Sequence, residues 1–365
     1  MSGGAAADAD WMSQALTLAE RGLYTTDPNP RVGCVLVRDD VAVGAGWHVR
    51  AGEPHAEVIA LRAAGSKARG ATAYVTLEPC SHTGRTPPCA DTLIQAGVVR
   101  VVAALTDPNP NVAGAGIARL KAAGVEVTVG VQAAGARALN AGFFSRFERL
   151  RPFVRLKLAM SLDARTALAD GRSKWITGEP ARADVQHWRA RSSAVCTGCG
   201  TVRADDPRLD VRLAYGPWIR QPLRVVLDSE LTVNPHANVF RDGNVVVFGA
   251  QDAPALDAAA FSVERVARGA GGLELRAVLR VLAAREINEV LVECGPLLAT
   301  SFVQQRLVDE LILYVAPLLL GADARAMLQI SGLDSIAGAP QFEYTDVRQI
   351  GDDLRLTLRP KQSLE

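Results

Sequence analysis

Four side chains in the first quarter of the chain have the types and spacing of a catalytic zinc site. His55 and Glu57 lie two residues apart in the segment PHAE, and Cys80 and Cys89 follow in PCSHTGRTPPC. Histidine nitrogen and cysteine sulfur are ligands that zinc prefers, and a catalytic zinc has three protein ligands and an open position for water. The sequence therefore predicts His55, Cys80 and Cys89 as zinc ligands, with Glu57 beside the water.

The chemistry of such a site is the hydrolytic removal of an amino group from a heterocycle. Zinc lowers the pKa of its bound water toward neutrality, and Glu57 can pass a proton from that water to a ring nitrogen and then to the departing amine. The pattern H-x-E with P-C-x-x-C is a signature of zinc deaminases of nucleobases. Here the second cysteine lies nine positions after the first, so the signature is matched only in part and the intervening segment must loop out.

Other interpretations of the histidine and the cysteines remain open at this point. A structural zinc would need a fourth protein ligand, which His82 could supply, and cysteines are also common as buried apolar residues. Cys196 and Cys199 have C-x-x-C spacing, but a zinc ribbon needs a second such pair. We interpret these two, together with Cys34 and Cys294, as core and turn residues.

The segments around the predicted zinc ligands alternate between helix and strand. Prolines at positions 54 and 88 suit the first turns of helices that begin near His55 and Cys89. The other predicted elements are helices over 11–23 and 115–124 and strands over 31–39, 41–47, 71–77, 98–105 and 125–130. Strands separated by helices predict a parallel or mixed sheet with both faces covered. We expect residues 1–14 to be a short floppy tail.

A second α/β pattern begins near Arg151, after a basic helix that includes NAGFFSRFERL. Its predicted strands cover 153–161, 193–198, 223–229, 244–249, 288–295 and 310–317, with helices over 180–192 and 273–286 and a C-terminal hairpin over 341–360. A chain of 365 residues is long enough for two domains. We therefore predict domains 1–150 and 151–365.

The composition argues against several classes of protein. The net charge of +1 disfavours nucleic acid or an anionic membrane as a partner, because such proteins usually carry an excess of basic residues. No run of about 18 uncharged apolar residues is present, so no transmembrane helix is predicted. The first residues lack a signal peptide, and six cysteines in a chain of this length indicate a reducing, cytoplasmic location.

Motifs along nearly the whole chain resemble one known family. TTDPNPRVGCVLV, AGEPHAEVIALRAAG, TAYVTLEPCSHTGRTPPC and DPNPNVAGAGI resemble the deaminase half of the bifunctional riboflavin-biosynthesis deaminase/reductase family. RLKLAMSLDARTA, SKWITG, TVRADDPRLDVR and VECGPLLATSF resemble its reductase half. The motifs occur in the order of the family, and the long spacing between Cys80 and Cys89 is the spacing of that family.

The resemblance implies a fold and a reaction for each half. Residues 1–150 would form a cytidine-deaminase-like three-layer α/β/α domain that binds one Zn²⁺ and deaminates 2,5-diamino-6-ribosylamino-4(3H)-pyrimidinone 5′-phosphate. Residues 151–365 would form a dihydrofolate-reductase-like α/β domain that uses NADPH to reduce the ribosyl side chain to ribityl. The partner would be this small phosphorylated pyrimidine, with no nucleic acid and no membrane.

In the deaminase half, the resemblance assigns six residues to the substrate. They are Asn29, His48, Arg85, Thr86, Asp107 and Asn109. Asn29 and Asn109 also lie in DPNP segments, where an asparagine can instead bond to its own turn. Arg31 stands where the family usually has a second asparagine, which predicts an altered substrate loop.

In the reductase half, the resemblance assigns a cofactor site and a substrate site. The NADP-binding residues would be Ala159, Trp175, Thr201, Asp205, Ser229, Gly295, Pro296, Leu297, Leu298, Ala299, Thr300 and Ser301. The residues at the sugar phosphate would be Ser173, Arg189, Leu209, Arg212 and Glu293. Physical chemistry supports part of this, because arginines grip phosphate in bidentate fashion and a helix that follows Gly295 can receive a pyrophosphate at its N-terminus.

Two further positions in this half bear on the prediction. Lys157, in the apolar segment VRLKLAM, can donate a proton near the reacting sugar, or it can be a solvated lysine on an edge strand. Ala164 stands where the family usually has glycine and would place a methyl group near the cofactor. No G-x-G-x-x-G fingerprint is present in residues 151–365, so this nucleotide site would not be of the standard dinucleotide-binding type.

Two other functions compete with the bifunctional enzyme. One is a zinc deaminase of tRNA or another nucleobase with an inactive or regulatory C-terminal nucleotide-binding domain, which would need a basic channel. The other is a non-catalytic protein that binds zinc and a nucleotide. The sequence leaves the oligomeric state open, and a homo-oligomer is compatible with it.

Overall fold

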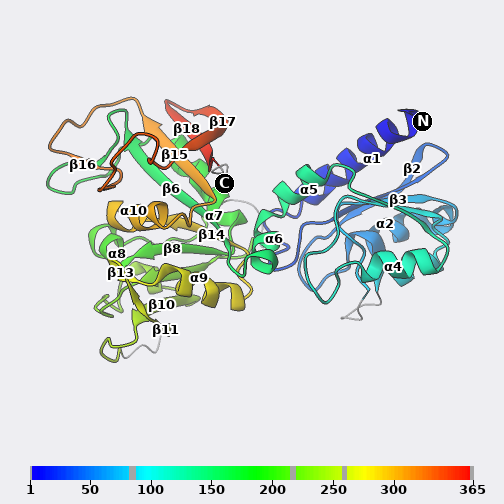
Figure 1. Cartoon of the computed structure of the whole chain (residues 1–365), viewed down its shortest axis with the longest axis horizontal. Helices are drawn as coiled ribbons and strands as arrows, with labels where there is room; N and C mark the ends of the chain where they lie inside the picture. Colours follow the sequence, from blue (N-terminus) through cyan, green and yellow to red (C-terminus); the bar gives the residue numbers. More distant parts are fainter. Residues whose placement is uncertain (1, 82–87, 214–218, 257–260, 362–365) are drawn as a thin grey trace. The chain divides into compact units, whose positions relative to one another are not determined.

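The computed structural model describes residues 2–81, 88–213, 219–256 and 261–361. These form two compact units, Met1–Leu150 and Arg151–Glu365, each with its own sheet (Figure 1). None of the described helices is both long enough and apolar enough to cross a bilayer.

The first unit contains a five-stranded mixed sheet. The strands β1 (Gly33–Arg38), β2 (Val41–Trp47), β3 (Thr72–Val75), β4 (Arg100–Ala103) and β5 (Glu126–Val129) lie in the order β2-β1-β3-β4-β5. Strand β1 pairs antiparallel with β2 and β3, whereas β3, β4 and β5 run parallel. The mixed sheet and its strands were predicted from the alternation of apolar segments.

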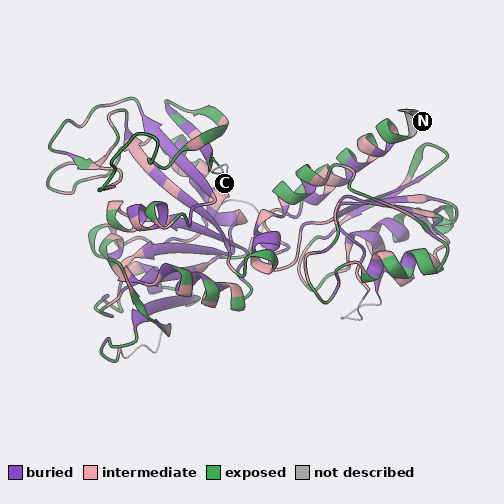
Figure 2. Cartoon of the chain, viewed as in Figure 1, coloured by how far each residue is buried: buried purple, intermediate pink, exposed green. Residues whose placement is uncertain are grey.

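Helices cover both faces of this sheet and make three layers. The helices α2 (Ala56–Ala64), α3 (Cys89–Gln95) and α4 (Ala115–Ala122) pack against Cys34 and Leu36, while α1 (Ser2–Glu20) and α5 (Ala133–Leu139) pack against Val35 and Val37. Alternate residues of β1 thus enter two separate cores, as strand geometry requires. Figure 2 shows the inner strands β1, β3 and β4 largely buried between partly exposed helices. A 3₁₀ turn (Gly65–Ala68) and α6 (Ala141–Glu148) complete the unit.

The expectation of a floppy tail at residues 1–14 was wrong, because α1 begins at Ser2. Met12, Ala15 and Ala19 are fully buried against the sheet, and Arg100 makes bonds of 2.8 and 2.7 Å to the carboxylate of Asp8. A Cβ atom on Gly33 would lie 2.0 Å from the carbonyl oxygen of Ala15. Tertiary packing therefore holds a segment that looks unstructured by composition.

The second unit contains a nine-stranded sheet in the order β11-β10-β9-β8-β14-β6-β15-β18-β17. Its strands are β6 (Phe153–Ser161), β8 (Ala194–Gly198), β9 (Leu223–Leu227), β10 (Val245–Ala250), β11 (Ser262–Val266), β14 (Glu289–Glu293), β15 (Glu310–Ala316), β17 (Phe342–Ile350) and β18 (Asp353–Pro360). The strands from β11 to β15 are parallel, and the predicted C-terminal hairpin β17–β18 adds antiparallel to β15. Strand β11 was not predicted.

The remaining elements of this unit are helices and two small strand pairs. The helices are α7 (Glu179–Arg191), α8 (Cys199–Asp205), a 3₁₀ turn (Asn238–Phe240), α9 (Leu275–Ala284) and α10 (Pro296–Gln304), and the pairs are β7 (Arg165–Ala167) with β16 (Arg325–Ala326) and β12 (Arg268–Gly269) with β13 (Gly272–Leu273). Strands β8 and β14 lead directly into α8 and α10. In such sheets, ligands bind at the carboxyl ends of the parallel strands.

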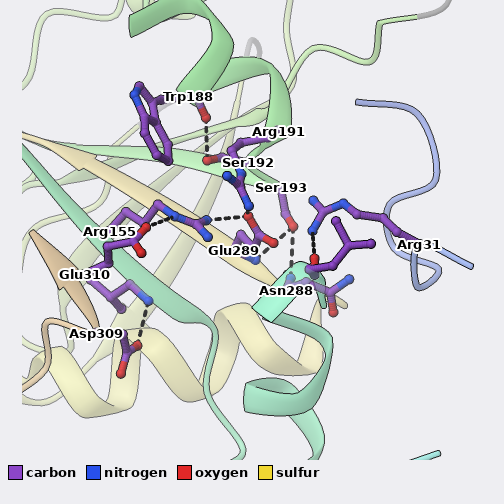
Figure 3. Close-up of polar contacts among 12 residues, drawn as sticks. Arg31, Arg155, Trp188, Arg191, Ser192, Ser193, Asn288, Glu289, Asp309 and Glu310 are labelled. Atoms are coloured by element: carbon purple, nitrogen blue, oxygen red, sulfur yellow. Dashed lines mark hydrogen bonds and ion pairs between the residues drawn. The ribbon is translucent and has the colours of Figure 1, made fainter. Parts of the chain in front are cut away.

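A buried ion cluster occupies the opposite ends of three of these strands (Figure 3). Arg155 on β6 donates to Glu310 on β15 at 2.7 Å and also forms an ion pair with Glu289 on β14. The three side chains are at most 8% exposed, so removal of one partner would leave an uncompensated buried charge at a cost of roughly 3–5 kcal/mol. The cluster fixes the register that sets Lys157 opposite Glu293 further along the strands.

Candidate active sites

The three predicted zinc ligands converge in the first unit. Their ligand atoms all lie within 4.8 Å of one another, and the Nδ1 atom of His55 is 3.6 Å from the sulfur of Cys80 and 3.3 Å from that of Cys89. A tetrahedral zinc at ordinary bond lengths separates its nitrogen and sulfur ligands by roughly 3.5 Å. The donor set therefore fits zinc. The alternative ligand His82 lies outside the described residues.

Helix starts place two of these ligands. His55 is the N-cap of α2 and Cys89 is the first residue of α3. The amide of Cys89 donates to the sulfur of Cys80 at 3.3 Å, and hydrogen bonds from Cys89 and His55 lower the pKa of the Cys80 thiol to about 4. The lowered pKa favours the thiolate of Cys80, the form that binds metal.

Glu57 lies in the first turn of α2, one residue beyond the start of the helix, and only 3% of its surface is exposed. Burial raises the pKa of Glu57 above its ordinary value, and the nearby His55 opposes this only in part. A carboxylate whose pKa is raised toward neutrality is suited to accept and then return a proton.

Helix α2 approaches the sheet closely at two glycines of β2. A Cβ atom on Gly44 would lie 2.3 Å from the carbonyl oxygen of Ala60, and one on Gly46 would lie 2.7 Å from that of Ala56. These glycines allow the start of α2, with His55 and Glu57, to sit directly against the strand. Their importance was not recognised from the sequence.

The structure brings Asn29 and His48 to the metal ligands. The rings of His48 and His55 are 5.3 Å apart in an edge-to-face arrangement. His48 lies 3.2 Å from the carbonyl oxygen of Pro54 through Nδ1 and 3.0 Å from the amide of Asn29 through Nε2. Burial lowers the pKa of His48, which favours a neutral ring that donates to Pro54 and accepts from Asn29. Arg85 and Thr86 lie outside the described residues.

Asp107 and Asn109 occupy a loop that turns on its own side chains. Asp107 accepts from the amide of Asn109 at 2.8 Å, and Asn109 accepts from the amide of Asn111 at 3.1 Å. Asn109 therefore makes the local turn that the DPNP segment allows. One further residue, Glu78, binds this loop through its carboxylate and was not singled out from the sequence.

Arg31, which stands where an asparagine was expected, is held by hydrogen bonds within the fold. Its guanidinium donates to the carbonyl oxygen of Leu139 at 2.7 Å, and Asn140 bonds to both its backbone amide and its carbonyl. The side chain is thus engaged at the link between α5 and α6.

The second unit contains a cavity of about 980 Å³ beside β6 and at the carboxyl ends of β8, β9 and β14. Most residues assigned to NADP and to the sugar phosphate line it: Ala159, Trp175, Thr201, Asp205, Ser229, Gly295, Pro296, Leu297, Leu298 and Ser301, and Lys157, Ser173, Arg189, Leu209, Arg212 and Glu293. Ala299 and Thr300 do not. Ala299 is fully buried, and Thr300 donates to Pro296 and accepts from the amide of Gln329.

Arg189 and Glu293 form a two-pronged ion pair in this cavity, with distances of 2.6 and 3.0 Å. Arg189 also donates to the carbonyl oxygen of Asp210 at 3.0 Å. Burial would raise the pKa of Glu293, but the charge and hydrogen bonds of Arg189 outweigh it and lower that pKa. Arg189 therefore orients Glu293.

Lys157 lies on β6 between β14 and β15, so it is not on an edge strand. Burial lowers its pKa, and the neighbouring Glu293 opposes this effect. Among the described residues, no hydrogen-bond or ion-pair partner within contact distance is found for its ammonium group, which leaves it available to a ligand in the cavity.

Two of the positions singled out in this half, Leu209 and Ala164, have left-handed backbones. Leu209 lines the cavity at φ +54°, and its amide has no hydrogen-bond partner among the described residues, which suits a bound anion. Ala164 has φ +58° and does not line the cavity. Its replacement of glycine therefore costs backbone strain and places no methyl group in the cavity lining.

Within the part of the chain that the structure describes, His55, Cys80 and Cys89 form the one group with metal-ligand spacing. Cys196 is a buried residue of β8, and Cys199 opens α8. Cys34 is buried in β1, and Cys294 follows β14 at the cavity. Cys34 and Cys196 are thus core residues and Cys199 begins a helix, whereas Cys294, expected in the core, is half-buried in the lining of the cavity.

Comparisons with known proteins assign both units. Residues 5–105 match the cytidine and deoxycytidylate deaminase zinc-binding region, and residues 152–356 match the RibD C-terminal domain. The chain is 49% identical to the riboflavin biosynthesis protein RibD of Escherichia coli over 362 residues, which cover 96% of this chain and 99% of that protein. RibD of Haemophilus influenzae is also 49% identical, over 97% of this chain and 98% of that protein.

Solved structures give the same result over the full length. Acinetobacter baumannii RibD superposes with a TM-score of 0.92 at 48% identity and covers 98% of this chain and 100% of that chain. A Thermotoga maritima diaminohydroxyphosphoribosylaminopyrimidine deaminase/5-amino-6-(5-phosphoribosylamino)uracil reductase superposes with a TM-score of 0.85 at 34% identity, with the same coverage.

Fold and site together define a two-domain enzyme, a cytidine-deaminase-like zinc-binding domain followed by a dihydrofolate-reductase-like domain. Such an enzyme acts on a small molecule as both a deaminase and a reductase. The chain belongs to the RibD family of bifunctional riboflavin biosynthesis proteins. This confirms the predicted fold class and activity, and it disfavours a tRNA deaminase with an inactive second domain.

Proposed function

We propose that residues 1–150 deaminate 2,5-diamino-6-ribosylamino-4(3H)-pyrimidinone 5′-phosphate and that residues 151–365 then reduce its ribosyl group to ribityl with NADPH. The observation that carries the proposal is the convergence of His55, Cys80 and Cys89 beside the buried Glu57. The name of the Thermotoga maritima relative supports this substrate.

In the deaminase site, His55, Cys80 and Cys89 would hold one Zn²⁺. Bound zinc supplies an activated water molecule as the nucleophile. Glu57 accepts a proton from that water and returns it to the ring nitrogen and then to the leaving ammonia. Asn29, His48, Asp107 and Asn109, with Arg85 and Thr86, would bind the pyrimidine and its phosphorylated ribose.

In the reductase site, the residues that line the cavity suit a nicotinamide nucleotide and a sugar phosphate. Thr201, Ser229 and the turn at Gly295 offer hydroxyl and backbone groups to the cofactor, which supplies hydride to C1 of the sugar. The side chain of Arg212 is 60% exposed and, with the amide of Leu209, suits the 5′-phosphate.

Lys157 and Glu293 would act on the sugar itself. The ammonium of the half-buried Lys157 donates a proton to the ring oxygen as the C1–O bond opens, and its lowered pKa favours this transfer. Glu293, held by Arg189, accepts hydrogen bonds from the ribose hydroxyls. Reduction at C1 then gives the ribityl chain.

The test is the product mass after zinc-loaded protein is incubated with the pyrimidine and NADPH. We expect a product in which an amino group is replaced by oxygen and two hydrogens are added. A product that is deaminated but not reduced would contradict the reductase proposal, either in its choice of NADPH or in its choice of the ribosyl group. Unchanged pyrimidine would contradict the substrate, and activity on tRNA instead would restore the rejected alternative.

A further inference from the structure

Glu78 is a buried carboxylate with four backbone partners. It lies two residues before the zinc ligand Cys80 and is 4% exposed. One oxygen accepts from the amides of Asp107 and Gly114 at 3.1 and 2.9 Å. The other accepts from the amides of Gly116 and Ile117 at 2.9 and 3.2 Å. A carboxylate bound by several amides is strongly fixed in position.

These contacts make Glu78 the cap of helix α4, from a distant part of the chain. Gly114 is the N-cap position of α4 and provides no side chain to satisfy the first amides. Glu78 satisfies two of them, at Gly116 and Ile117. A Cβ atom on Gly116 would lie 1.9 Å from the carbonyl oxygen of Pro79, so the helix start packs directly on the residue before Cys80.

Helix α4 in turn supports the segments that bear both cysteine ligands. Arg119 donates to the carbonyl oxygen of Ser81 at 3.1 Å, next to Cys80, and forms a 2.5 Å ion pair with Asp91, two residues after Cys89. The same Glu78 carboxylate binds the amide of Asp107. One side chain thus joins the metal-ligand turn, its supporting helix and the loop of Asp107 and Asn109.

We infer that Glu78 is a positioning residue that sets the distance between the zinc ligands and the substrate loop of the deaminase site. Its hydrogen bonds go to the amides of Asp107, Gly114, Gly116 and Ile117, so it acts through the backbone of the substrate loop and of α4. The inference rests on the proposed substrate role of Asp107 and Asn109.

Glu78→Gln is the sharpest variant, because the amide keeps the shape but replaces one acceptor oxygen with a donor that faces two N–H groups. We expect the KM for the pyrimidine to rise at least about tenfold, because two of the four amides lose their acceptor and a tenfold change is the scale of one hydrogen bond to a charged group. Zinc content and NADPH-dependent reduction of the deaminated intermediate should stay at wild-type levels. Those two readouts show that the chain is folded.

Glu274→Gln is the matched control. Glu274 caps α9 in the second unit through the amides of Arg276 and Ala277, so this variant loses the same kind of cap away from the deaminase site. It should lower stability without a change in deaminase KM. If both variants raised that KM equally, a general loss of stability would explain the effect and the inference would fail.

A double-mutant cycle tests the route through the substrate loop. If Glu78 acts through Asp107, adding Glu78→Gln to Asp107→Ala should raise the KM little further. If the two residues act independently, the fold-changes in KM of the single variants should multiply in the double variant. Glu78→Asp, which keeps the charge but is one methylene shorter, should give an intermediate KM and serves if Glu78→Gln does not fold. Unchanged KM in either foldable variant, in a protein whose wild type deaminates the pyrimidine, would overturn the inference. An inactive wild type would instead count against the proposed function.

Discussion

Three buried or half-buried carboxylates in this chain have different partners and therefore different tasks. Burial raises the pKa of Glu57, and the nearby His55 offsets this only in part, so Glu57 can carry a proton. Glu293 is paired with Arg189, which lowers its pKa and keeps it an acceptor. Glu78 is surrounded by backbone amides and fixes a loop. Environment, more than residue type, separates these roles.

The role of Glu57 predicts a selective loss of activity. Glu57→Gln should keep zinc but lower the deaminase kcat by at least about 100-fold, because general acid–base catalysis contributes on that scale. Reduction of the deaminated intermediate should continue, because the reductase cavity is built from residues of the second unit. Zinc content and both activities are measured on one preparation. Surviving deamination would show that another group moves the proton.

The left-handed backbone at Ala164 predicts a gain in stability. A non-glycine residue at φ +58° is destabilised sterically by about 1 kcal/mol. Glycine removes this cost, but it also makes the unfolded chain more flexible, which offsets part of the gain. Ala164→Gly should therefore stabilise the second unit by between 0 and about 1 kcal/mol. Since Ala164 does not line the cavity, the KM for NADPH should not change, and a marked change would place the methyl group at the cofactor after all. Thermal unfolding and cofactor titration give both values.

At this scale the sequence predicted residues whose chemistry is visible in their type. Zinc ligands and a nearby carboxylate could be named before the fold was known. The role of Leu209 could not be derived from its residue type, because what it offers to a ligand is its backbone amide in a left-handed conformation. Glu78 was missed because its partners are amides thirty to forty residues away in the chain. Ala299 and Thr300 were included in an unbroken motif, although helix periodicity turns them toward the core.

Among the elements, α2 approaches its sheet closely and carries Glu57, with the zinc ligand His55 at its N-cap. A Cβ atom on Gly46 would meet both Ala56 and Ile59 at 2.7 Å. Gly46→Ala should destabilise the first unit by roughly 1–3 kcal/mol, as other overpacked sites do, and should weaken zinc retention because His55 shifts with the helix. Unfolding and chelator competition measure the two effects.

Gly135→Ala is the control for that variant. Gly135 lies in α5, and a Cβ atom there would meet only the end of the Leu16 side chain, at 3.3 Å. Alanine favours helix over glycine by up to about 1 kcal/mol, so this variant should be neutral or stabilising and should retain zinc. Equal zinc loss in both variants would remove the special role of the α2 contact.

The Arg189–Glu293 pair joins α7 to β14 and makes the second unit sensitive to acid. Because the pKa of Glu293 is lowered in the folded state, the pair stabilises the fold above the ordinary value of 4.5 and loses that contribution as the pH falls through the lower folded value. Glu293→Gln should be less stable than wild type by on the order of 3 kcal/mol at neutral pH. Below pH 4.5 the difference should shrink, and a constant difference would exclude this linkage.

Elements with strong apolar patterns were predicted well, whereas those held by tertiary contacts were not. Strand β6 matches its predicted bounds, because six of its nine residues are apolar and Pro152 marks its start. Strand β11, with the pattern SVERV, is half polar and exists because β10 pairs with it. The small pairs β7–β16 and β12–β13 are too short to leave a period in the sequence.

For the whole molecule, two units with separate sheets and cores predict two responses to metal removal. Chelation of zinc should abolish deamination and lower the thermal transition of the first unit, because a ligand that binds only the folded state stabilises it by several kcal/mol, about 4 at a thousandfold excess over Kd. Reduction and the transition of the second unit should be retained. Calorimetry with and without chelator, followed by zinc readdition, tests whether only the transition of the first unit moves. A single transition for the whole chain whose temperature falls on chelation would contradict the prediction.

In the nine-stranded sheet, the ion cluster and the cavity lie toward opposite ends of the same strands. Arg155, Glu289 and Glu310 lie at one end, and Lys157, Glu293 and Gly295 lie toward the other. A protein engineer could therefore vary the cavity end to accept a different sugar phosphate while the opposite end keeps the strands in register. Sequence libraries confined to the residues after Glu293 and around Leu209 should yield many folded members, and libraries at the ion cluster few.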